Sequence, residues 1–236
     1  MRANNIIKKL KSLSDKNSAA QSKRYFKTNL GEYGYNDRFL GIKVPTIRKI
    51  ASEYLEISDD EIVKLLNSRY HEIRYCGVII LVSKYLKSND KIFRKKLFNL
   101  YLNQINLGNI NNWDLIDISA PTFGLYLIDR KDSKKILSTL ASSGNLWERR
   151  ASVLLTFAYL KKLEINPTLI ICKKLLYDKE DLIQKAVGWS LREVGKINKD
   201  ILNEFLAEHI SKISRTSLRY AIEKFSPSER QYWLNK

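Results

Sequence analysis

The stretch IQKAVGWSL, residues 183–191, is the middle copy of a pattern that occurs three times in the C-terminal half of the chain. The other copies are WERRASVLL (147–155) and LRYAIEKF (218–225). All three align on an alanine that recurs every 35 residues: Ala151, Ala186 and Ala221. An earlier copy, EIRYCGVII (72–80), has Cys76 in that position. A small residue inside an apolar helix permits close packing, and this period is typical of HEAT-type repeats.

The rest of the chain also has helical periodicity. Apolar residues recur at spacings of three and four in segments 61–70, 91–105, 132–142 and 200–213. GVIILVSKYL (77–86) is ambiguous, because its β-branched run also suits a buried strand, but its length and neighbours favour a buried helix. No linker rich in Pro, Gly or Ser divides the chain. We therefore predict one all-α domain over residues 1–236, a HEAT-like or ARM-type helical-repeat solenoid with a concave basic face.

The composition favours a polyanionic partner. The 236 residues include 42 Lys+Arg and 25 Asp+Glu, a formal net charge of +17. DNA, RNA or an anionic membrane surface would suit that charge, although a generally basic, soluble surface is the plainer alternative. Two cysteines and two histidines make a zinc site unexpected, and neither histidine lies in a motif with a plausible catalytic partner. Without a signal peptide or membrane-spanning segment, we expect a cytoplasmic protein, nucleoid-associated in a prokaryote.

A basic residue precedes the small residue in each copy of the repeat. These residues are Arg74, Arg150, Lys185 and Arg219. Equivalent positions in stacked repeats line one face, so these cations could form a positive stripe suited to a phosphate backbone. The alternative is that they are ordinary solvated positions at the ends of repeat helices.

The segment 28–50 differs from its surroundings because it is polar and contains glycine. Residues 31–37 (GEYGYND) have the composition of a mobile loop. Val44-Pro45-Thr46 looks like the start of a helix, with Lys43 and Arg48 beside it. A helix N-terminus next to cations is a plausible phosphate contact, although the segment could equally be an ordinary connection between helices.

The stretch NNWDLIDISAP (111–121) places a carboxylate next to an indole. In a helix, Trp113 and Asp117 would share one face, and Pro121 would end or bend that helix. Trp189 would likewise share a face with Lys185 and Arg192, an arrangement suited to stacking on sugars or bases. A lone tryptophan is more often a core residue, and Asp117 could simply pair with an arginine inside a repeat interface.

A family resemblance covers most of the chain. The chain resembles the DNA alkylation-repair glycosylases of the AlkD family through several segments in order: RYFK (24–27), FLGIKVPTIRK (39–49), NWDLIDISAPTF (112–123), NLWERRA (145–151), IQKAVGWSLRE (183–193) and RTSLRYAIEKF (215–225). The resemblance implies a solenoid that cradles duplex DNA and hydrolyses the glycosidic bond of N3- and N7-alkylated purines, such as 3-methyladenine and 7-methylguanine. It implies no cofactor or metal, and we expect a monomer.

The resemblance also assigns roles to individual residues. The catalytic aspartate falls on Asp117, and the tryptophans that contact the sugar fall on Trp113 and Trp189. The remaining assignments are the active-site arginine at Arg150, the tyrosine of the first helices at Tyr25, backbone contacts at Lys43, Thr46 and Arg48, and a position near the lesion at Arg192. The sequence departs from the family in Asn112, where some members have tryptophan, and in the longer loop 31–37. These departures concern the range of lesions and the DNA contacts near the loop.

Two other functions fit the same sequence. One is a non-catalytic HEAT-repeat module that binds nucleic acid, and the other is a scaffold whose positive charge meets an acidic partner. Binding alone gains nothing from a carboxylate near phosphates, so Asp117 separates the enzyme from the module. Salt dependence separates nucleic-acid binding from the scaffold.

Overall fold

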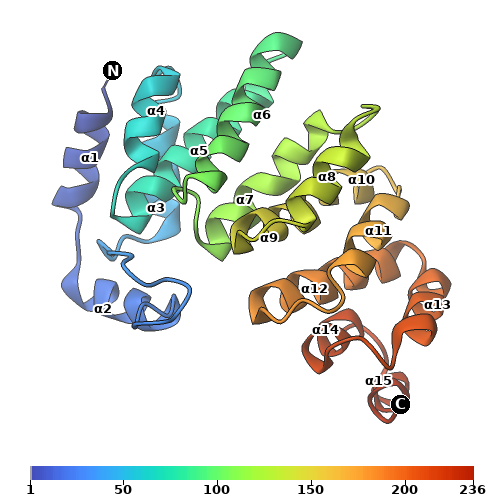
Figure 1. Cartoon of the computed structure of the whole chain (residues 1–236). Helices are drawn as coiled ribbons and strands as arrows, with labels where there is room; N and C mark the ends of the chain where they lie inside the picture. Colours follow the sequence, from blue (N-terminus) through green and yellow to red (C-terminus); the bar gives the residue numbers. More distant parts are fainter. Residues whose placement is uncertain (1) are drawn as a thin grey trace. The chain divides into compact units, whose positions relative to one another are not determined.

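The computed structural model describes residues 2–236, and its regular secondary structure is helical (Figure 1). The elements are α1 (Ala3–Ser12), α2 (Lys16–Tyr25), α3 (Val44–Ser52), α4 (Asp59–Leu66), α5 (His71–Lys87), α6 (Lys91–Asn106), α7 (Trp113–Phe123), the 3₁₀ turn η1 (Gly124–Tyr126), α8 (Ser133–Ala141), α9 (Leu146–Leu155), α10 (Phe157–Leu160), α11 (Asn166–Lys174), α12 (Asp181–Ile197), α13 (Lys199–His209), α14 (Arg215–Ala221) and α15 (Pro227–Leu234). Residues 2–236 contain no β-strand, and the one isolated bridge joins Arg38 to Tyr70. The all-α prediction is confirmed, including a helix over 77–86.

The chain forms two compact units, the first ending at Ser119 and the second beginning at Ala120. In the first unit, α5 is the central helix and contacts α3, α4 and α6. In the second unit, α9 packs against α12, and α12 packs against both α13 and α14. Each unit has its own apolar core. The single domain expected over residues 1–236 stays a prediction.

The repeat found in the sequence corresponds to equivalent packing positions. Cys76, Ala151, Ala186 and Ala221 lie in α5, α9, α12 and α14, and all four are fully or almost fully buried. Gly188 shows how close the helices approach, because a Cβ atom there would lie 2.5 Å from the carbonyl oxygen of Ser217 in α14. A larger side chain at position 188 would therefore clash where α12 packs against α14.

Pro121 was expected to end or bend its helix, and it does not end α7. Pro121 lies inside the helix, which continues to Phe123 and then tightens into η1. Proline removes one backbone donor, but its fixed φ angle is compatible with a helix, so the turn can continue beyond it. The helix start at Val44–Thr46 is confirmed, because α3 begins at Val44 with Pro45 in its first turn.

The segment 31–37 consists of turns, and its end is anchored in the first unit. The backbone N–H of Gly34 donates to the carbonyl of Lys27 at 3.0 Å. Asp37 is buried and lies 2.7 Å from the guanidinium of Arg74. The loop therefore contributes a charged side chain to the interior of the first unit.

Candidate active site

Helix α7 brings together two of the predicted active-site residues. Trp113 and Asp117 are one turn apart in this helix, so their side chains leave the same face, and both residues are half-buried. The carboxylate of Asp117 also interacts electrostatically with Tyr101, a fully buried residue of α6. Burial raises the pKa of Tyr101, and the negative charge of Asp117 raises it further.

The indole of Trp113 is held by aromatic side chains from the end of α2. It stacks on Phe26, with ring centroids 5.5 Å apart, and meets Tyr25 edge-on at 5.9 Å. Tyr25 is 66% exposed, whereas Trp113 is half-buried. Aromatic pairs with these geometries contribute about 0.5–1.5 kcal/mol beyond area burial. The structure therefore places Tyr25 and Trp113 in direct contact.

A buried polar cluster lies beneath the start of α7. His71 Nε2 lies 2.8 Å from Asp114 Oδ2, and His71 Nδ1 lies 3.4 Å from Asp37 Oδ2. Asp37 also accepts hydrogen bonds from Arg74 at 2.7 Å and from Asn112 at 3.1 Å. We name these five residues the His71 cluster. The sequence places neither histidine in a motif with a plausible catalytic partner, and the two carboxylates beside His71 come from residues remote in the chain.

The charges of the cluster shift the pKa values of its members. Burial alone would lower the pKa of His71, but the charge and hydrogen bond of Asp114 and the hydrogen bond of Asp37 outweigh it and raise that pKa to about 9. Burial would raise the pKa of Asp37, but the hydrogen bond to His71 and the charge of Arg74 hold it below its ordinary value. His71 is therefore an imidazolium, and Asp37 a carboxylate, near neutral pH.

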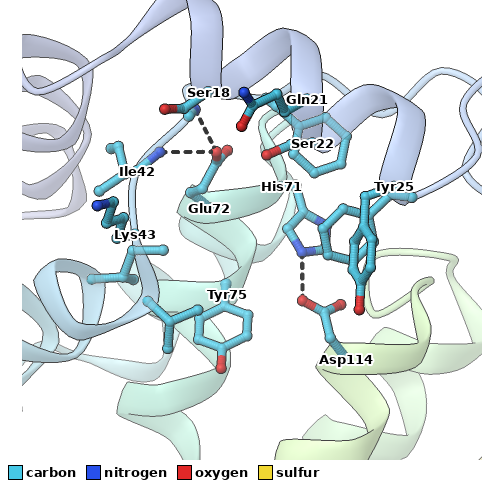
Figure 2. A pocket seen from close by; sticks show the side chains of 15 residues that line it. Ser18, Gln21, Ser22, Tyr25, Ile42, Lys43, His71, Glu72, Tyr75 and Asp114 are labelled. Atoms are coloured by element: carbon cyan, nitrogen blue, oxygen red, sulfur yellow. Dashed lines mark hydrogen bonds and ion pairs between the residues drawn. The ribbon is translucent and has the colours of Figure 1, made fainter.

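A hollow of ≈ 450 Å³ opens beside this cluster (Figure 2). Its walls come from α2, α3, α5, the start of α7 and the segment 39–43, and its lining includes Tyr25, Lys43, His71, Tyr75 and Asp114. At its base the Glu72 carboxylate accepts hydrogen bonds from successive backbone N–H groups, including those of Leu40 and Gly41. Glu72 thereby fixes the chain that leads into α3.

The segment predicted to contact the DNA backbone lies at the start of α3. Lys43 and Arg48 are exposed and Thr46 is half-buried. Lys43 is the N-cap residue of α3, and it makes no side-chain capping bond there. The first N–H groups of a helix attract anions, and nearby cations strengthen that attraction. The arrangement is therefore suited to a phosphate.

Trp189 belongs to the second unit, whereas Trp113 belongs to the first. The indole N–H of Trp189 donates to Glu193 at 3.2 Å, and its ring meets Phe157 edge-on at 4.8 Å. Arg192 lies between two carboxylates, Glu193 at 3.6 Å and Glu223. The predicted DNA contact at Arg192 would therefore have to share this guanidinium with Glu223.

The basic residues of the repeat do not form a uniform exposed stripe. Arg74 is 4% exposed and paired with Asp37, and Arg150 is 5% exposed and donates to the Leu182 carbonyl at 2.5 Å. Lys185 is half-buried and lies 2.6 Å from Asp181, whereas Arg219 is exposed. Arg74 and Arg219 thus occupy the same position in the repeat, but the first is buried and the second is exposed. The packing of neighbouring helices decides which of these side chains is covered. We therefore exclude Arg74 and Arg150, which are both internal, from the proposed DNA contacts.

Sequence reasoning missed the cluster that supports Trp113. Phe26 follows Tyr25 in the sequence, and Asp114 follows Trp113. Both could have been proposed as supporting residues, because the neighbours of a functional residue often position it. Asp37 and His71 offered no such signal, because 43 residues separate His71 from Asp114. Their association depends on the packing of α5 against the start of α7.

The sequence matches the model of a known family over nearly its whole length. The family described as "DNA alkylation repair enzyme" matches residues 6–225. The chain belongs to the DNA alkylation repair enzyme family. This confirms the resemblance to AlkD-type proteins and supports a role in DNA alkylation repair. No curated protein matches the sequence.

Solved structures related to this DNA alkylation repair protein share its fold. A "predicted DNA alkylation repair enzyme" from Enterococcus faecalis has a TM-score of 0.70 at 19% identity, covering 91% of this chain and 97% of that one. AlkD2 from Streptococcus mutans has a TM-score of 0.56 at 19% identity, covering 90% and 99%. A protein described as related to the HEAT-like repeat DNA glycosylases, with affinity for branched DNA structures, has a TM-score of 0.56 at 10% identity, covering 94% and 83%. These similarities confirm the HEAT-like fold.

Residues 2–236 lack the features of two other kinds of site. None of the helices described there combines the length and apolar character that crossing a membrane requires. The same residues contain no group of three or more His, Cys, Asp or Glu side chains that could hold a metal ion.

Proposed function

We propose that this member of the DNA alkylation repair family is a DNA N-glycosylase. Its substrate would be a cationic N3- or N7-alkylated purine in duplex DNA, and its products the free base and an abasic sugar. One observation carries the proposal: Trp113 and Asp117 leave the same face of α7, one turn apart, with the ring of Tyr25 against the indole. An indole and a carboxylate on one face suit a reaction that develops positive charge.

The chemistry of the substrate explains why these groups suffice. Alkylation at N3 or N7 makes the purine ring cationic, so the base leaves as a neutral molecule without a general acid. Breaking the glycosidic bond leaves an oxocarbenium-like sugar, which the Asp117 carboxylate stabilises. Water then attacks C1′, and Asp117 orients it and accepts its proton. Trp113 and Trp189 would contact the deoxyribose, each contributing about 0.5–2 kcal/mol of cation–π stabilisation.

The proposed DNA contacts surround that chemistry. In the first unit, Lys43, Thr46 and Arg48 would bind the phosphate backbone at the start of α3, and Tyr25 would pack on the DNA beside Trp113. In the second unit, the proposed contacts are three cations, Lys185, Arg192 and Arg219. Such contacts fix the register of the duplex and carry no sequence preference.

Release of 7-methylguanine from a methylated duplex under single-turnover conditions tests the proposal. Asp117→Asn should release the base at least about a hundredfold more slowly than the wild type, with unchanged affinity for duplex DNA. Asp129→Asn is the matched control, because the Asp129 side chain is 86% exposed, and it should keep the wild-type rate. If the wild type releases no base yet binds duplex in a salt-dependent way, the chain is a nucleic-acid-binding module and the glycosylase proposal is wrong.

A further inference from the structure

His71 stands out among the buried ionisable groups because each of its ring nitrogens faces a carboxylate. The Nε2 atom is 2.8 Å from Asp114, and the Nδ1 atom is 3.4 Å from Asp37. A neutral imidazole can satisfy Asp114 through one N–H but brings no positive charge to Asp37, whereas an imidazolium bonds Asp114 and also places a positive charge at ion-pair distance from Asp37. The geometry alone therefore favours the charged form.

The charge balance of the cluster leads to the same conclusion. Asp37 and Asp114 contribute two negative charges, and Arg74 contributes one positive charge from the same helix as His71. With a neutral His71, this buried group would carry an uncompensated negative charge, which is costly away from water. With an imidazolium, the two positive and two negative charges cancel.

The ring contacts that other elements make with His71 are aromatic. From α2 the contact is the Phe26 ring, with centroids 4.7 Å apart, and from the segment before α3 it is the Phe39 ring at 5.0 Å. On its own helix, the Tyr75 ring lies 6.3 Å away. Glu72 is turned toward the backbone N–H groups of residues 40–42. The carboxylates of Asp37 and Asp114 thus dominate the environment of the ring.

Two connections link His71 to Trp113. The first is covalent, because the carboxylate bound to His71 belongs to Asp114, the next residue after Trp113. The second is aromatic, because Phe26 contacts the His71 ring and also stacks on the indole at 5.5 Å. Asn112, on the other side of Trp113, bonds Asp37 at 3.1 Å. The residues before and after Trp113 are therefore both tied to the His71 cluster.

We propose that His71 is a positioning residue for Trp113, and that its imidazolium fixes the indole against which the deoxyribose packs. The inference rests on the proposed function for the role of Trp113 in the reaction. Without the imidazolium, Arg74 would balance only one of the two carboxylates, Asp37 and Asp114. The start of α7 would then shift, and the indole would lose its orientation.

Fluorine NMR of protein labelled with 5-fluorotryptophan tests the connection without any assay of activity. The Trp113 signal is assigned with Trp113→Phe, and the spectra are followed from pH 7 to pH 10.5. In the wild type the Trp113 signal should shift with a midpoint near pH 9, and in His71→Asn that transition should be absent. His209→Asn, which removes the other histidine, should leave the transition intact. Because Tyr25 contacts the same indole, the titration is repeated in Tyr25→Phe and should persist.

Single-turnover kinetics distinguish a role of His71 in positioning Trp113 from a role in folding. His71→Asn should slow single-turnover base release by about tenfold to a hundredfold at pH 7.5, while affinity for duplex DNA changes little. The double variant His71→Asn/Asp114→Asn removes one charge of each sign and should recover much of the lost rate. Thermal melting of both variants confirms that they are folded at the assay temperature.

Three results would overturn the proposal. They are a Trp113 signal that does not move with pH in the wild type, a transition that survives in His71→Asn, and a double variant that is slower than the single one although folded. If the wild type releases no base, the glycosylase proposal fails. The fluorine titration still decides whether His71 controls Trp113.

Discussion

The guanidinium of Arg74 lies 2.7 Å from the carboxylate of Asp37, and both side chains are buried in the first unit. Arg74 occupies the same repeat position as Arg219, which is exposed. The two arginines therefore allow a direct comparison between a cation that holds the fold together and one that is available to a ligand.

Arg74→Gln should destabilise the protein, whereas Arg219→Gln should weaken DNA binding. Removing Arg74 breaks its buried ion pair with Asp37. The free energy of unfolding should then fall by about 3–5 kcal/mol. Removing Arg219 should reduce the slope of log affinity against log salt by about 0.9. Urea unfolding and salt-dependent binding to a duplex measure the two effects. A change of slope in folded Arg74→Gln equal to that of Arg219→Gln would contradict this assignment.

The stability of the protein should fall as the pH rises from neutral. The pKa of His71 is about 9 in the folded protein and 6.5 for an ordinary histidine, so the folded state binds the proton more tightly. The stabilisation is fully present below pH 6.5 and is lost as the pH rises through 9. The loss is on the order of 3 kcal/mol. Urea unfolding at pH 6 and pH 9.5 measures it, and His71→Asn should lack most of the difference.

Glu72→Gln should destabilise the connection between α2 and α3. The Glu72 carboxylate accepts hydrogen bonds from the N–H groups of Leu40 and Gly41 at 2.9 and 2.7 Å, and a neutral amide accepts them more weakly. We expect a loss of about 1.5–3 kcal/mol, visible as a lower Tm. Glu53→Gln serves as the control, because its pair with Lys9 is exposed and contributes less than about 1 kcal/mol. Equal losses of stability in the two variants would show that the hydrogen bonds to Glu72 contribute no more than the exposed ion pair of Glu53.

Gly188→Ala should disturb the contact between α12 and α14. The added Cβ would lie 2.5 Å from both the Ser217 carbonyl oxygen and the Tyr220 Cβ, neither of which can easily move aside. Overpacking of this kind costs about 1–3 kcal/mol. Gly144→Ala is the matched control, because nothing lies within 4 Å of a Cβ there, and it should change stability by less than about 0.5 kcal/mol. Thermal melting distinguishes the two variants.

The sequence determined the helical class, the repeat and the family. Helical periodicity and small residues such as Ala151 and Ala186 are local properties, and each copy of the repeat must bury that residue wherever the copies stack. The one-turn spacing of Trp113 and Asp117 is likewise fixed once the segment is helical. Of the two outcomes expected at Pro121, an end or a bend of the helix, the end does not occur, because a proline near the end of a helix can be tolerated there.

Only the tertiary structure decided which charged residues are buried and which pair with one another. Arg74 and Arg219 cannot be distinguished by their place in the repeat, yet one is internal and the other is on the surface. His71 meets Asp114 across 43 residues because α5 packs against the start of α7. The pairing of buried charges depends on distances between helices that are remote in the chain, and a local sequence pattern carries no information about those distances.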